Sequence, residues 1–316
     1  MSRWVKPIEP TPISAILTRV IVACVVSGGC AVKQQPLPDL NKMWDYNDPA
    51  GTEAKFRALL PAAEKSGDVS YHAQLLTQIA RAQGLQGRYD EAMATLNHAT
   101  FITRDDMNLV HLRELLERGR VLNSRGDPAA AMRSFMAAYK LGESEHYWKY
   151  AIDAVHMMGI AAATPQEQIE WNLRGIEMVN QHPDQKGWLH ALYNNLGESY
   201  AKAGDYRNAL DAFERLSAIN DNDIYTLKDQ ARMLRLLGQV GRAMEIICAI
   251  HERLDGEGKR DGWISEEYAE CLLAAGRADE AAPHFKVAYA LLKTDPWMLK
   301  NEPAKLERLR RLAGER

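Results

Sequence analysis

The sequence predicts an all-α protein built as a solenoid of about six helical hairpins. Its 316 residues include long segments dominated by Ala, Leu, Glu, Arg, Gln and Met, which favour helix, and few alternating runs of β-branched residues. A short phrase, in which a Gly is followed five residues later by an Ala, recurs at residues 85–99, 124–138, 201–216, 236–250 and 274–288. One hairpin cannot bury its apolar face alone, so a repeated hairpin predicts stacked neighbours.

Residues 1–30 resemble a bacterial export signal that ends in a lipidation site. An apolar run over residues 20–26 is followed by three small residues and then Cys30, which is the preferred lipidated residue because its apolar run is uninterrupted. Cys24 fits the usual lipoprotein motif better letter by letter, but Arg19 would then lie inside the apolar run. Two interpretations stay open: a lipoprotein tethered in the cell envelope, facing the periplasm or the exterior, and a cytoplasmic protein with an N-terminal extension.

Residues 31–51 are predicted to be a flexible linker, because they contain three prolines and have no helical period. Trp44 and Tyr46 are unusual in a linker. One interpretation is that they pack over the first helix as a lid, and the other is that this segment docks into the protein's own binding groove.

Five marker glycines set the period of the repeat, at Gly87, Gly126, Gly204, Gly238 and Gly276. The intervals between them are 39, 78, 34 and 38 residues, so the second interval contains two repeats. A degenerate repeat is therefore expected in the middle, with Thr164 as a helix N-cap and Pro165 in the first helical position.

A solenoid needs a polar cap at each end, and the predicted solenoid covers residues 52–314. Residues 52–65, closed by Gly67, are expected to form the N-terminal capping helix, and residues 301–313 the C-terminal one. In the latter, three leucines are predicted to face inward and Lys305 and Arg308 to face outward.

The repeat that spans residues 190–223 resembles a tetratricopeptide repeat (TPR). The residues that carry the resemblance, at that family's spacing, are Tyr193, Leu196, Gly197, Tyr200, Gly204, Tyr206, Ala209 and Phe213. The resemblance extends with drift over units that start near Ala73, Leu112, Lys149, His190, Ile224 and Gly262. It implies a right-handed solenoid, and phrases such as LYNNLGESY are similar to a group of uncharacterised bacterial repeat proteins.

The resemblance also implies a binding groove, because in this family the first helix of each hairpin lines a concave face. The positions carried over to this chain and expected to bind a partner are Arg81, Arg113, Arg120, Tyr150, Asp153, Asn194, Asn195, Glu198, Lys228, Arg232, Glu266 and Glu270. They make the groove basic near its start and acidic near its end. We therefore expect a non-enzymatic scaffold that binds a protein or an extended peptide.

Other classes of function are less favoured by the residues. With 39 basic against 42 acidic residues the chain has no basic excess for nucleic acid, and no motif of metal-ligand or cofactor-binding spacing is present. No cofactor or metal is therefore predicted, and nothing indicates an oligomeric state. Glu266 and Glu270 lie four residues apart, so an enzyme that uses them as acid and base is the remaining alternative.

Three further residues have open roles. Cys248 and Cys271 fall on adjoining predicted helices, as buried thiols or as a disulfide. His156 lies where the resembled family has Gly or Ala. It is expected to be a buried structural histidine, with a pH-sensitive or ligand-contacting role as the alternative.

Overall fold

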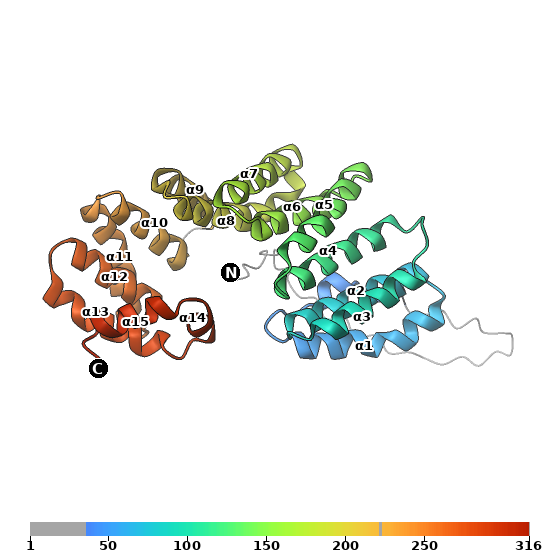
Figure 1. Ribbon diagram of the computed structural model, residues 1–316, viewed down its shortest axis with the longest axis horizontal. Coiled ribbons are helices and arrows are strands. Elements are labelled where there is room, and N and C mark those ends of the chain that lie inside the picture. Colours follow the sequence, from blue (N-terminus) through green and yellow to red (C-terminus); the bar gives the residue numbers. More distant parts are fainter. Residues whose placement is uncertain (1–35, 221–222, 316) are drawn as a thin grey trace, which may run out of the picture. The chain divides into compact units, whose positions relative to one another are not determined.

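The computed structural model describes residues 36–220 and 223–315, and over these residues the chain is all α, as predicted. The described chain forms fifteen α-helices and two short 3-10 helices and contains no strand (Figure 1). It divides between Met157 and Met158 into two compact units. The predicted signal and lipidation sites, Cys24 and Cys30, lie outside the described residues.

The N-terminal unit consists of a short turn and six helices, the last of which continues past the division. These elements are η1 (Leu40–Met43), α1 (Pro49–Ser66), α2 (Val69–Leu85), α3 (Tyr89–Ile102), α4 (Asn108–Ser124), α5 (Pro128–Ser144) and α6 (Trp148–Ala161). Helix α2 pairs with α3 and α4 with α5, and α2 also packs against α4. First helices therefore lie beside first helices, as stacked hairpins require.

The C-terminal unit repeats this arrangement. Its elements after α6 are α7 (Pro165–Gln181), η2 (Pro183–Trp188), α8 (Leu189–Lys202), α9 (Tyr206–Ile219), α10 (Ile224–Leu236), α11 (Val240–Gly256), α12 (Gly262–Ala274), α13 (Ala278–Leu292), α14 (Pro296–Asn301) and α15 (Pro303–Leu312). The hairpins α8/α9, α10/α11 and α12/α13 pack in sequence, and α15 closes the unit against α13.

The marker glycines end the first helices in a left-handed conformation. Their φ angles are 77°, 94°, 78°, 76° and 76° for Gly87, Gly126, Gly204, Gly238 and Gly276. Only glycine adopts this conformation without strain, which explains why the residue recurs at each turn. In the degenerate repeat the turn is made differently, since Thr164 and Glu167 form a reciprocal capping box and Pro165 begins α7, as predicted.

The capping helices are present with shifted bounds. Helix α1 begins at Pro49, three residues before the expected start, and Gly67 ends it with a φ of 72°. The C-terminal helix predicted over residues 301–313 is present as α15, which begins two residues later, at Pro303. A separate short helix, α14, precedes it and was not predicted. Leu306 and Leu309 of α15 are buried as expected.

Candidate functional site

The first helices of the N-terminal unit carry a buried ladder of alternating charges. Arg81 of α2 lies 3.4 Å from Glu117 of α4, measured from Nη1 to Oε1. Arg120 of α4 approaches Glu117 at 2.6 Å and Asp153 of α6 at 2.5 Å. Because these residues recur at about one repeat length, the stacking of hairpins places them on adjoining helices at one level. The predicted residues Arg81, Arg120 and Asp153 are thus brought together.

Burial and pairing together set the protonation of this ladder. Burial alone raises the pKa of Asp153, but Arg120 and Arg81 outweigh burial and hold that pKa below its usual value. Burial alone would lower the pKa of Arg120, but the carboxylates of Asp153 and Glu117 outweigh burial, so this pKa lies above its usual value. Burial also lowers the pKa of His156 to about 4, with Asp153 partly opposing. His156 is therefore neutral at pH 7, as a buried structural histidine should be.

Arg113 and Tyr150 form a second group on the same unit. The Cζ atom of Arg113 lies 5.4 Å from the centre of the Tyr150 ring, and its Nη1 donates to Gln74 Oε1 at 2.8 Å. Burial raises the pKa of the Tyr150 hydroxyl, and Arg113 partly opposes this. The two predicted residues therefore contact each other.

The N-terminal segment of residues 38–46 lies on this set of residues. Trp44 Nε1 donates to Gln78 Oε1 of α2 at 2.9 Å, and Arg113 Nη2 donates to Asn41 Oδ1 at 2.6 Å. The rings of Trp44 and Tyr46 stack at 4.9 Å, and Arg81 lies 5.4 Å from the centre of each. The prediction of a flexible linker through residue 51 thus does not describe this segment, which packs against the repeats.

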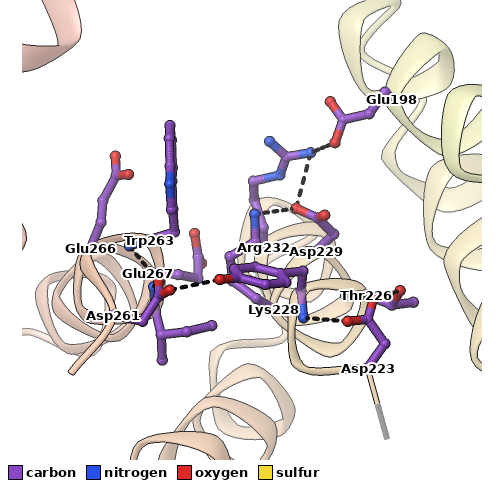
Figure 2. A network of polar contacts seen from close by, with 12 residues as sticks. Glu198, Asp223, Thr226, Lys228, Asp229, Arg232, Asp261, Trp263, Glu266 and Glu267 are labelled. Carbon is purple, nitrogen blue, oxygen red and sulfur yellow. Dashed lines mark hydrogen bonds and ion pairs between the residues drawn. The ribbon is translucent and has the colours of Figure 1, made fainter. Parts of the chain in front are cut away.

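A second polar network joins the first helices of the C-terminal unit (Figure 2). Arg232 of α10 donates from Nη2 to Glu198 Oε1 of α8 at 2.6 Å, and the same Nη2 lies 3.5 Å from Asp229 Oδ1. Lys228 Nζ lies 2.7 Å from that Asp229 oxygen. The predicted residues Glu198, Lys228 and Arg232 are therefore held in one network around Asp229, which is buried.

Aromatic side chains flank this network. Tyr225, which is exposed, donates from its hydroxyl to Asp261 Oδ2 at 2.8 Å. Trp263 of α12 and Arg232 of α10 are directed to the same side of the network in Figure 2. One face of the Trp263 ring carries Lys305 from α15, with Nζ 4.9 Å from the ring centre.

The acidic residues of the predicted groove are paired with cations that the sequence analysis did not place there. Lys305 of α15 lies 2.8 Å from Glu266 Oε2, and Arg308 of α15 pairs with Glu270. Lys305 and Arg308 were predicted to face outward, and their side chains are 33% and 44% exposed, but both also reach carboxylates of α12. Arg235 similarly pairs with Glu267 at 2.7 Å, although the sequence analysis did not select Arg235. Arg235 follows Arg232 by about one helical turn, and this spacing could have indicated that it lies near the same face.

This pairing bears on the enzyme alternative. Burial raises the pKa of Glu266, and Lys305 partly opposes this. Both Glu266 and Glu270 are paired with basic side chains of α15. No group of three or more His, Cys, Asp or Glu side chains within the described ranges is placed to hold a metal ion.

Asn194 and Asn195 of α8 are half-buried on the unit that contains the second network. The Nδ2 atom of Asn195 is buried and has no hydrogen-bond partner within residues 36–220 and 223–315. Cys248 and Cys271 are free thiols rather than a disulfide. No helix in the described part of the chain is long and apolar enough to cross a membrane.

Comparisons with known proteins agree with this architecture. The tetratricopeptide repeat family matches residues 73–106, 190–223 and 265–285, and no curated protein matches the sequence. A tetratricopeptide repeat protein from Parabacteroides merdae is 18% identical, with a TM-score of 0.53 over 87% of this chain and 97% of its own. The C-terminal part of a TPR repeat-containing protein from Cytophaga hutchinsonii is 15% identical, with a TM-score of 0.54 over 82% of this chain and 96% of its own.

A third similar structure was solved with a bound peptide. NprR in complex with its cognate peptide NprX is 12% identical, with a TM-score of 0.50, and the match covers 86% of this chain and 82% of that one. At these identities the likeness concerns the fold. The matches identify tetratricopeptide repeats at residues 73–106, 190–223 and 265–285, and the stacked helical hairpins agree with them.

Proposed function

We propose that this protein is a non-enzymatic scaffold that binds a segment of a partner protein on the first-helix face of its C-terminal unit. We further propose that lipid on Cys30, or on Cys24, holds it in the cell envelope. The observation that carries the binding proposal is the network around Asp229, which fixes the side chains of Lys228 and Arg232 next to exposed Tyr225 and half-buried Trp263.

Fixed side chains favour binding because less conformational entropy is lost when a partner is held. Arg232 contacts Glu198 and Asp229, so its guanidinium group is already oriented before any partner arrives. Aromatic rings and arginine are also the side chains that contribute most at protein interfaces. The half-buried amide of Asn194 adds a group that hydrogen-bonds to a peptide backbone. The peptide complex of NprR, whose fold is similar, supports this mode of binding.

Photo-crosslinking in the native host tests this proposal. A photoreactive amino acid placed at Asn194 or at Tyr225 should crosslink the same partner protein. The matched control is Arg207, an exposed residue of α9 in the same repeat as Asn194 but on its second helix. Crosslinks of equal yield from Arg207, or none from Asn194 and Tyr225, would contradict the proposed face.

The lipid anchor is tested separately, by the intact mass and the N-terminal peptide of the protein purified from its host. A mature chain that begins at an acylated Cys30 or Cys24 supports the envelope location. An unmodified chain that begins at Met1 or Ser2 would place the scaffold in the cytoplasm and leave the binding proposal standing.

A further inference from the structure

The segment that precedes α1 is anchored in the N-terminal unit by an aliphatic side chain. Leu40 is 4% exposed and packs in a cluster that contains Phe56 of α1 and Leu75 and Ile79 of α2. Trp44 contacts the edge of the Phe56 ring, with ring centres 5.4 Å apart. These contacts place the short helical turn of η1 over the first two helices.

Beyond this anchor, the segment contacts side chains at positions that were expected to bind a partner. Asn41 accepts a hydrogen bond from Arg113, and the stacked pair of Trp44 and Tyr46 lies against Arg81. Within the described residues, the hydrogen bonds that join residues 38–46 to α2 and α4 all involve a side chain. The segment is thus held by side-chain recognition and shares no backbone ladder with the repeats.

The outer side of the same segment is exposed. Asn41, Asp45 and Tyr46 are exposed, and Tyr46 retains 39% of its accessible surface. Nothing in the described chain covers these residues from outside. A segment that is bound on one side through side chains and open on the other has the arrangement of a peptide in a groove.

We propose that the face formed by α2 and α4 is a recognition site for a short helical turn followed by two aromatic residues that are separated by one residue, and that residues 39–46 are its resident occupant. The site has three parts: an apolar pocket that takes Leu40, Arg113 for an amide oxygen, and Gln78 with Arg81 for the aromatic pair. An external partner of this face carries the same chemistry and binds by displacing residues 39–46. The proposal goes beyond the proposed function, since it concerns the other unit and holds whether or not the C-terminal unit binds a partner.

The test uses the full chain with Trp44→Ala and Tyr46→Ala, which loosens the resident segment, and a fluorescent synthetic peptide of residues 36–48. Anisotropy should show saturable binding to this variant and at least tenfold weaker binding to the unsubstituted chain, where the site is occupied. Adding Arg81→Ala to the variant should weaken binding at least tenfold again. A peptide in which both aromatic residues are Ala is the matched control and should not bind. If the peptide fails to bind a variant that keeps its helical circular dichroism, the proposal is wrong.

Hydrogen exchange on the unsubstituted chain keeps the proposal testable if the variant does not fold. Amides of residues 40–46 should exchange by a local opening, faster than the protected amides of α2 and α4. Exchange of this segment only through global unfolding would show that it is an inseparable part of the fold and would overturn the proposal.

Discussion

Arg120 Nη2 lies 2.5 Å from one oxygen of Asp153 and 2.6 Å from the other, and both residues are buried. The same guanidinium group donates from Nη1 to Glu117, which also contacts Arg81. One buried arginine therefore compensates two carboxylates on adjoining first helices. Because a buried charge without a partner costs far more than an exposed one, this residue should matter more to stability than its neighbours on the surface.

Replacing Arg120 with Met should lower the free energy of unfolding by about 3–5 kcal/mol, since it leaves Asp153 buried without its main partner. Chemical denaturation followed by circular dichroism measures the change. Adding Asp153→Asn should restore part of the loss, because the orphaned charge is then removed. The surface control in the same unit is Arg104→Ala, whose exposed pair with Asp106 should be worth about 0.5 kcal/mol or less. Equal losses for Arg120→Met and Arg104→Ala would show that the ladder is energetically unimportant.

His156 should make the N-terminal unit sensitive to mild acid. Its pKa of about 4 in the folded protein is below the value of about 6.5 expected when unfolded, so the unfolded chain binds the proton first as the pH falls. The contribution of His156 to the free energy of unfolding is therefore fully present above pH 6.5. It is lost as the pH falls from about 6.5 to 4, by up to about 3 kcal/mol. Asp153 and Arg120 face the ring, and Asp153, whose pKa is depressed, adds its own loss only below about pH 4.

The measurement is the free energy of unfolding of the unsubstituted chain and of His156→Gln between pH 7 and 4. The curve of the variant should be flatter over this range, because glutamine takes up no proton. Parallel curves would mean that His156 is not held neutral by its surroundings.

The repeats and their turns could be predicted from the sequence because they depend on local chemistry. Glycine adopts a positive φ readily and so ends a helix, as Gly204 ends α8. A capping threonine followed by proline begins a helix, as Thr164 and Pro165 begin α7. Spacing then orders the hairpins. The expected C-terminal helix included residues 301 and 302, although Pro303 already marks the start of α15. The short helix α14 was not predicted.

The pairing of charges on the groove face could not be predicted in the same way. Position within the repeat gave the residues that share the face, but not that Glu117 would be shared by Arg81 and Arg120. Which partner a side chain selects depends on the distances between packed helices and on the side-chain rotamers. The ion pairs of the α15 cations were missed for a related reason, since nothing in the sequence of α15 shows that its side chains reach α12.

Cys271 should resist alkylation in the folded protein and Cys248 should not. Cys271 is buried, and burial raises the pKa of its thiol, so little thiolate is present to react. Cys248 is only half-buried. Iodoacetamide labelling followed by peptide mass spectrometry should show at least tenfold faster modification of Cys248, and similar rates for both in denaturant. Recovery of a disulfide-linked peptide containing both residues would contradict the free thiols of the structure.

Gly197 of α8 should be intolerant of a side chain because the paired helix approaches it closely. A Cβ atom there would lie 2.6 Å from Cε1 and Cζ of Phe213, which is fully buried. Gly197→Ala is therefore expected to destabilise the C-terminal unit by about 1–3 kcal/mol through overpacking. The second change Phe213→Leu should recover part of this loss in the Gly197→Ala background, although it is destabilising on its own.

Gly241 of α11 is the matched control, since it is also helical but has no heavy atom within 4 Å of the position of an added Cβ. Gly241→Ala should raise the free energy of unfolding by about 0.5–1 kcal/mol, because alanine favours helix without creating a clash. Denaturation of the two single variants and of the Gly197→Ala/Phe213→Leu pair measures these effects together. Opposite signs for Gly197 and Gly241 would locate the cost in the contact with Phe213, whereas a gain at both positions would show that the helices separate easily to admit a methyl group.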